Sequence, residues 1–122
     1  MVIEEKKRIL VAVAMESGLI DTNVKDFAFV TQRMIEIYAK KNHDYGNSFD
    51  IGTDVIGLPY AVGHLYEKTN RIISLMKKGN KVDESMEDSL LDLANYSVML
   101  LKYLRNKNKD EDNKDKDTNK ME

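Results

Sequence analysis

The stretch DESMEDSLLDLANYSVMLLKYL, residues 83–104, decides how this chain folds. Its apolar residues recur at helical spacing around most of the circumference, which predicts a helix over about 85–106 that other helices bury. The same stretch carries Asp88, Asp92 and Asn95. A carboxylate in an apolar setting is costly unless it pairs with a cation or binds a metal. A metal site or a polar-ligand site on this helix is therefore the first hypothesis.

Three more helices are expected upstream. Residues 24–42 place apolar side chains on one stripe and charged side chains opposite, with Asn23 as N-cap. Pro59 suits the first turn of a helix over 59–78. Residues 3–16 are assigned to a helix because EEKK precedes the apolar run, although RILVAVAM alone fits a strand equally well. Between residues 43 and 59, three glycines and several turn formers predict a long loop.

The predicted fold class is all-α: a compact bundle of about four helices with the long loop between the second and the third. A length of 122 residues suits one domain, placed at residues 1–105, and residues 106–122 form a charged tail predicted to be disordered. The helix over 85–106 is apolar on too many sides for four modest helices to cover. The bundle is therefore expected to be completed by oligomerisation, as a homodimer or a larger assembly.

Composition excludes several function classes. The chain has no cysteine, so disulfides, thiolate metal sites and cysteine nucleophiles are ruled out. A formal net charge of −2 gives no global basic field, so direct binding of nucleic acid is not expected. No apolar run approaches the roughly 20 residues of a membrane span, and a cytoplasmic location is expected. No Walker-type phosphate loop, dinucleotide fingerprint or zinc-protease motif is present.

Polar side chains on two helices define a candidate site. On the helix over 59–78, His64, Glu67 and Arg71 share a stripe, and Lys68 lies at its edge. If this stripe faces the acidic stripe of the helix over 85–106, one pocket gathers carboxylates, an imidazole and two cations. Carboxylates suit Mg²⁺ or Mn²⁺, and the two cations suit phosphate oxygens. The chemistry would then be attack of an activated water on a phosphoryl centre.

Each of these residues also has a structural interpretation. Asp88 fits a capping box with Ser85. Glu67 and Arg71 fit an exposed i, i+4 ion pair. His64 fits a histidine on a polar helix face, and Asn95 fits an interhelical hydrogen bond. Asp92 is hardest to explain structurally, because it lies in an apolar run four residues from another aspartate.

The segment KNHDYGNSF, residues 41–49, supplies a second cluster. Tyr45 and Phe49 could stack on a base, and Gly46 allows a close backbone approach. The alternative is that the aromatic side chains anchor the loop to the core. Both interpretations stay open at this point.

These residues resemble a known family. KNHDYGNSF, YEKTNRIISL and DESMEDSLLDLANYSVML occur in the same order in the phage and prophage nucleotide modification associated domain family. That family looks like a divergent relative of the all-α MazG-like and dimeric dUTPase-like nucleoside triphosphate pyrophosphohydrolases. The resemblance spans about residues 30–104. It implies an α-helical bundle, dimeric or larger, that handles nucleotides in phage nucleotide metabolism or DNA base modification within a bacterial host cell.

The chain departs from the pattern of the wider superfamily, in which a Glu-Glu-x-x-Glu helix and a Glu-x-x-Asp helix hold Mg²⁺. The helix over 59–78 offers only Glu67, followed by Lys68 and Arg71, and the helix over 85–106 offers Asp88-x-x-x-Asp92. Acidic residues are thus lost and basic residues gained. A cationic pocket of this kind can hold a nucleotide phosphate without a metal.

The leading functional hypothesis is a metal-dependent nucleoside triphosphate pyrophosphohydrolase. Its alternatives are a non-catalytic binder that sequesters a nucleotide signal of host antiviral defence, and a structural adaptor that uses its helices only for association. The predicted catalytic and metal residues are Glu67, Asp88 and Asp92, with Mg²⁺ or Mn²⁺ as cofactor. The predicted substrate-binding residues are Lys41, Asp44, Tyr45, Asn47, His64, Lys68, Arg71 and Asn95.

Overall fold

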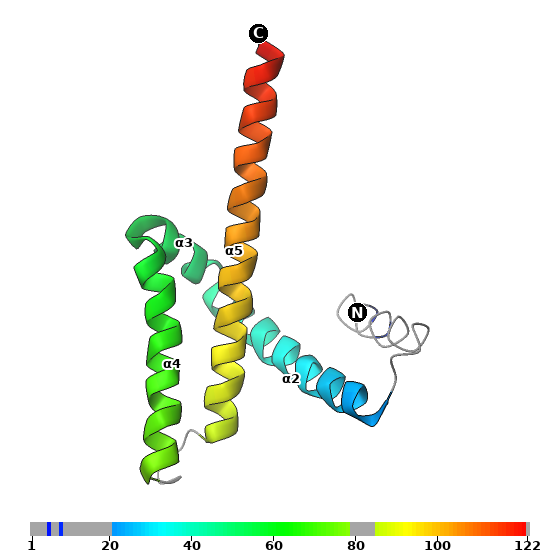
Figure 1. The fold of residues 1–122 in the computed structure, drawn as a ribbon, viewed down its shortest axis with the longest axis vertical. Coiled ribbons are helices and arrows are strands. Elements are labelled where there is room, and N and C mark those ends of the chain that lie inside the picture. The colour runs from blue at the N-terminus through cyan, green and yellow to red at the C-terminus, as the bar shows by residue number, and fades with distance from the viewer. Residues whose placement is uncertain (1–4, 6–7, 9–20, 79–84, 122) are drawn as a thin grey trace. The chain divides into compact units, whose positions relative to one another are not determined.

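The computed structural model describes residues 5, 8, 21–78 and 85–121. Within them the chain forms three long helices and one short helix, α3. They are α2 (Thr22–Tyr45), α3 (Ser48–Ile56), α4 (Leu58–Lys78) and α5 (Met86–Met121), shown in Figure 1. The described residues contain no β-strand, and the predicted all-α class is confirmed. The helix predicted over 3–16 lies outside the described residues, apart from residues 5 and 8.

The chain divides into two compact units, Met1–Asp44 and Tyr45–Glu122. The first contains nearly all of α2, whose start corrects the predicted N-cap. The helix begins at Thr22, and the backbone N–H of Val24 donates to the Asp21 carboxylate at 2.9 Å. Asp21, not Asn23, therefore caps the helix. Phe27 and Val30, on the predicted apolar stripe, are exposed.

The segment predicted as a long loop contains a helix instead, α3. Asn47 precedes the helix and Ser48 begins it. The Asn47 carbonyl accepts a hydrogen bond from the backbone N–H of Ile51 at 3.0 Å. The Thr53 side chain is buried, and its hydroxyl donates to the Phe49 carbonyl at 2.7 Å. Gly57 then ends the helix: its φ of 103° favours glycine, and its N–H donates to the Thr53 carbonyl at 2.8 Å. Turn formers thus stand at the two ends of a short helix, Asn47 before it and Gly57 after it, although the Asn47 side chain makes no capping hydrogen bond.

Gly52 lies inside this helix, where a close contact with another helix leaves little room for a side chain. A Cβ atom at that position would lie 2.5 Å from two ring carbons of Tyr60, in the first turn of α4. Real Cβ contacts are essentially never so short, so any side chain at this position would have to displace the Tyr60 ring. The close approach fixes α3 against α4, the helix it packs on.

α4 and α5 form the main packing unit, and they lie side by side in Figure 1. Ala61 and Leu75 of α4 and Ser89 and Leu91 of α5 are buried. The small side chains of Ala61 and Ser89 are fully covered, which indicates close helix packing at these two positions. The Ser89 hydroxyl has no hydrogen-bond partner within the described part of the chain.

α5 is longer than predicted, since it continues as a helix through residues 106–121, the segment expected to be disordered. Side chains over 106–117 are all exposed, so this part adds nothing to the core. Charged residues of both signs recur there at helical spacing, which supports an isolated helix. The domain boundary at residue 105 stays a prediction. No helix in the described ranges is long and apolar enough to cross a membrane.

A polar cluster joins α3 to this part of α5. The Tyr103 hydroxyl donates to the Asp54 carboxylate at 2.6 Å, and the Lys107 ammonium lies 2.9 Å from the same oxygen. The hydrogen bond from Tyr103, followed by that from Lys107, lowers the pKa of Asp54. Asp54 in turn raises the pKa values of Tyr103 and Lys107. The first turn of the predicted tail is therefore held to α3.

Candidate functional site

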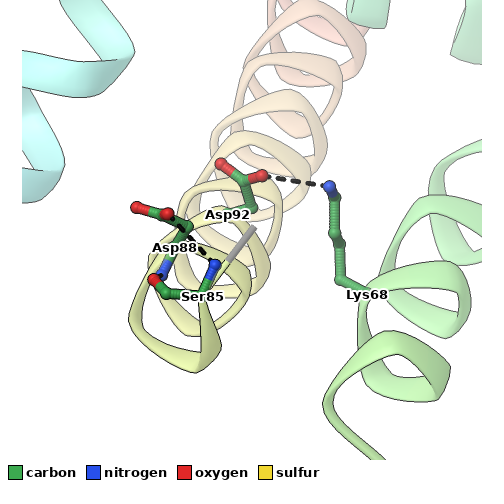
Figure 2. Close-up of polar contacts among 4 residues, drawn as sticks. All are labelled: Lys68, Ser85, Asp88 and Asp92. Carbon is green, nitrogen blue, oxygen red and sulfur yellow. Dashed lines mark hydrogen bonds and ion pairs between the residues drawn. The ribbon is translucent and has the colours of Figure 1, made fainter. Parts of the chain in front are cut away.

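The centre of the candidate site is an ion pair between α4 and α5. The Lys68 ammonium lies 3.0 Å from a carboxylate oxygen of Asp92, and Figure 2 shows the two side chains reaching toward each other. Each side chain is only 14% exposed. Charges so far removed from water are stable only as a close pair. Asp92, the residue hardest to explain from sequence, is thus neutralised by a lysine of the facing helix.

A ring stack lies one helical turn away. The rings of His64 and Tyr96 are nearly parallel, with centroids 4.8 Å apart and an interplanar angle of 11°. His64 precedes Lys68 by four residues on α4, and Tyr96 follows Asp92 by four on α5. Equal steps in opposite directions define an antiparallel register. The stack and the ion pair therefore occupy successive turns of one helix–helix interface.

The ring stack belongs to a larger aromatic cluster. Tyr60 meets His64 edge to face at 4.8 Å, and the Phe49 ring lies 5.9 Å from Tyr96 and 6.0 Å from His64. Phe49 is buried, with 6% of its surface exposed. It therefore anchors α3 to α4 and α5, and the anchoring alternative is correct for this residue. His64 lies in the ring cluster rather than on a polar face.

Asp88 caps α5. The backbone N–H of Asp88 donates to the Ser85 hydroxyl at 3.0 Å, and the N–H of Ser85 donates to the Asp88 carboxylate at 3.3 Å (Figure 2). These reciprocal bonds form a capping box, which satisfies two backbone donors that the helix start leaves unpaired. The interpretation of Asp88 as part of a capping box with Ser85 is thus confirmed, and its carboxylate accepts a hydrogen bond at the start of α5.

The remaining residues of the predicted pocket lie on the same two helices as the ion pair. Glu67 is exposed on α4, next to Lys68 in sequence, while Arg71 on α4 and Asn95 on α5 are partly buried. The described residues contain no group of three or more acidic, histidine or cysteine side chains arranged to hold a metal ion. Glu67, Asp88 and Asp92 therefore do not meet as the predicted metal-ligand set in this arrangement.

Residues of the second predicted cluster lie on different elements. Lys41 is exposed near the end of α2, and Asn47 is exposed immediately before α3. Asp44 and Tyr45 belong to the last turn of α2, but their side chains are outside the described part of the structure. Lys41 and Asp44 belong to the first compact unit, and the ion pair to the second.

Sequence reasoning found the members of the central pair but not their pairing. Lys68 was assigned to a phosphate and Asp92 to a metal, whereas the structure joins them. The position of Lys68 at the apolar edge of its stripe was the available signal, because a lysine there needs a nearby anion. The contact between Asp54 and Tyr103 had no such signal, since 49 residues separate them.

Residues 41–104 match the family model described as nucleotide modification associated domain 1. The match covers more than half of the 122 residues. The chain belongs to this family. The nucleotide modification associated domain thus includes α3, α4 and α5 as far as Leu104, with the Lys68–Asp92 pair and the ring cluster. It begins at Lys41 rather than near residue 30, where the resemblance had placed its start. No curated protein and no solved structure matches this chain.

Proposed function

We propose that this protein binds a nucleotide at the interface of α4 and α5, with the phosphates at Lys68 and Arg71. The family description supports a nucleotide as the ligand. The observation that carries the location is the Lys68–Asp92 pair, 3.0 Å apart and largely buried between the two helices. A buried ion pair is often no more stabilising than apolar side chains of similar volume. A functional role accounts for keeping charges there.

The chemistry of the surrounding side chains suits a phosphate. An ammonium has three N–H donors, and a phosphate oxygen accepts from them as a carboxylate oxygen does. Arg71, three residues further along α4, adds a planar guanidinium that can hold two phosphate oxygens at once. Asn95, three residues beyond Asp92, supplies an amide for a base or sugar. In this proposal Tyr45 and Asn47 contribute further contacts to the nucleoside, and Lys41, Asp44 and His64 stay predicted binding residues.

A bound nucleotide could be hydrolysed or only held, and the two outcomes differ in whether they require a metal ion. A pyrophosphohydrolase related to the MazG-like enzymes is supported by Asp88 and Asp92, which lie one turn apart on α5 with Glu67 on the neighbouring helix. As arranged, however, these residues do not fit a Mg²⁺ centre: Asp92 is paired with Lys68, and Asp88 caps the helix. On the basis of the Lys68–Asp92 pair we propose the non-catalytic binder, which would hold a nucleotide signal and return it intact.

Mass spectrometry of a nucleotide panel tests the proposal. Canonical, modified and cyclic nucleotides are incubated with the protein in Mg²⁺, Mn²⁺ or EDTA, and each is measured free and after gel filtration with the protein. The binder predicts one nucleotide retained unchanged in all three conditions. Metal-dependent release of a monophosphate and pyrophosphate, lost in Asp92→Asn, would establish the hydrolase instead. No retention and no turnover would contradict nucleotide binding.

We also propose that the protein works as a homo-oligomer. Val62, Tyr66, Ile73 and Met76 recur on one side of α4 at spacings of four, seven and three residues, and all are exposed. A lengthwise apolar stripe of this kind is the usual contact of a helix with another helix. α5 likewise exposes Leu90 and Leu101. A second copy of the chain would cover both helices.

A further inference from the structure

We infer that Lys68 takes the place of a divalent cation in this chain by neutralising Asp92, so that the site contacts a nucleotide phosphate through side-chain N–H donors of Lys68 and Arg71 rather than through Mg²⁺ or Mn²⁺. The inference deepens the proposed function, on which its phosphate part rests. Its metal part rests only on the arrangement of Lys68, Asp92 and Asp88.

The first step is the charge balance at Asp92. A hard divalent cation binds carboxylate oxygens directly, Mg²⁺ at about 2.1 Å. The Lys68 ammonium already lies 3.0 Å from Asp92 Oδ2. A dication bound to this carboxylate would therefore lie close to a fixed positive charge, and repulsion would weaken its binding. The carboxylate is already neutralised by a cation that belongs to the chain.

The second step is the burial of the pair. Both side chains are only 14% exposed, so water screens their interaction poorly. Moving Lys68 away would leave Asp92 as an uncompensated charge between α4 and α5, which is strongly unfavourable. The stack of His64 on Tyr96, one turn away, holds the two helices in the same register. The lysine is therefore a lasting partner of Asp92 rather than a mobile surface charge.

The third step concerns the other acidic residues. A metal ion needs several deprotonated ligands around one point. Asp88 accepts a hydrogen bond from the Ser85 backbone, which fixes it at the start of α5. Glu67 is exposed on α4, and no three such side chains cluster within the described ranges. The acids that could complete a metal shell are thus committed or dispersed, while the cations Lys68 and Arg71 share one helix.

The test is a titration of the full chain with Mn²⁺ alone, in which electron paramagnetic resonance measures the concentration of free ion at each step. We expect no saturable binding at Asp92 in the wild type: Asp92→Asn leaves the titration unchanged. We expect Lys68→Gln to gain weak Mn²⁺ binding at Asp92 that the wild type lacks, and Lys68→Gln/Asp92→Asn to lose that gain. Lys77→Gln, which changes an exposed lysine of α4, serves as the matched control and should behave as the wild type.

Two results would overturn the inference. One is saturable Mn²⁺ binding in the wild type that Asp92→Asn removes, and the other is an Mn²⁺ titration of Lys68→Gln that cannot be distinguished from that of the wild type. Circular dichroism confirms that each variant is helical, and the comparison of the wild type with Asp92→Asn keeps the test decisive if Lys68→Gln does not fold.

Metal-independent recognition of phosphate is then tested by titration calorimetry with inorganic pyrophosphate. The wild type should bind it with affinities in EDTA and in Mg²⁺ that agree within about twofold, and a tenfold loss in EDTA would contradict metal-independent recognition. No pyrophosphate binding in either condition would count against the proposed function, while the Mn²⁺ titration would still decide the role of Lys68.

Discussion

The imidazole of His64 lies almost parallel to the phenol ring of Tyr96, one helical turn from the ion pair of Lys68 and Asp92. These two contacts lie at successive levels of the same antiparallel helix pair. They hold α4 and α5 in one register, so the charged groups of the candidate site are positioned by helices rather than by a loop. Sites built on rigid elements lose less conformational entropy when a ligand binds.

Removing the lysine of the central pair should destabilise the fold. Lys68→Met leaves the Asp92 carboxylate largely buried without a cation, which typically costs about 3 kcal/mol of unfolding free energy. Lys77→Met, at an exposed position of α4, should change it by less than about 0.5 kcal/mol. Urea unfolding followed by circular dichroism measures both. In Lys68→Met/Asp92→Leu most of the lost stability should return, and an additive loss would show that the pair is not energetically coupled.

Two glycines provide a matched test of the contact between α3 and α4. Gly52→Ala places a methyl group 2.5 Å from ring carbons of Tyr60, and the resulting repacking should cost about 1–3 kcal/mol. Gly63→Ala, inside α4 with no atom beyond its own helix backbone and chain neighbours within 4 Å of the new Cβ, should instead stabilise by about 0.5–1 kcal/mol. Thermal unfolding of the two variants should therefore shift in opposite directions. Stabilisation of Gly52→Ala to the same extent as Gly63→Ala would contradict the close approach of α3 to this ring.

The cluster of Asp54, Tyr103 and Lys107 should respond to acid. The hydrogen bond from Tyr103 lowers the pKa of Asp54 below its unfolded value, so the contribution is present at neutral pH and is lost as pH falls through the lowered pKa. Wild type should be more stable than Asp54→Asn at pH 7, and the difference should shrink on acidification. Amide hydrogen exchange near Tyr103 and Lys107 measures this stability difference at the site of the contact. A difference that does not depend on pH would mean that the ionised carboxylate is not the tether.

The apolar stripe of α4 predicts an oligomer. Light scattering should give a mass of at least twice the 14.0 kDa of one chain. Val62→Lys puts a charge on the stripe and should shift the protein toward the monomer without loss of helix, because Val62 is 51% exposed in the single chain. Ser74→Lys, exposed on another side of α4, is the control and should keep the wild-type mass. A wild-type mass of one chain would contradict the proposal.

Much of the fold could be predicted from the sequence. The apolar periodicity located α2, α4 and α5, and Pro59 placed the start of α4 within one residue. α3 was missed because Gly52 and its polar neighbours have the composition of a loop. The Tyr60 ring occupies the space that a Cβ atom of residue 52 would take, which accounts for a glycine inside this helix. That requirement comes from another helix, so no local pattern contains it.

The candidate site was predicted less completely, for a related reason. Helical spacing identified Lys68, Asp88 and Asp92 as unusual, and it could assign each of them to a face. It could not determine which side chains meet. The structure pairs Lys68 with Asp92 and leaves Asp88 to cap its own helix with Ser85. We therefore propose binding of phosphate by side chains, where the sequence pattern alone predicts a metal site.

The most direct test of the central claim is an amide NMR titration of the wild-type protein with inorganic pyrophosphate in EDTA. The proposed site predicts shifts centred on residues 64–71 of α4 and 92–96 of α5, saturating without metal and absent at those residues in Lys68→Met/Asp92→Leu. Shifts confined to residues 22–45 of α2, or shifts that appear only after Mg²⁺ is added, would contradict it.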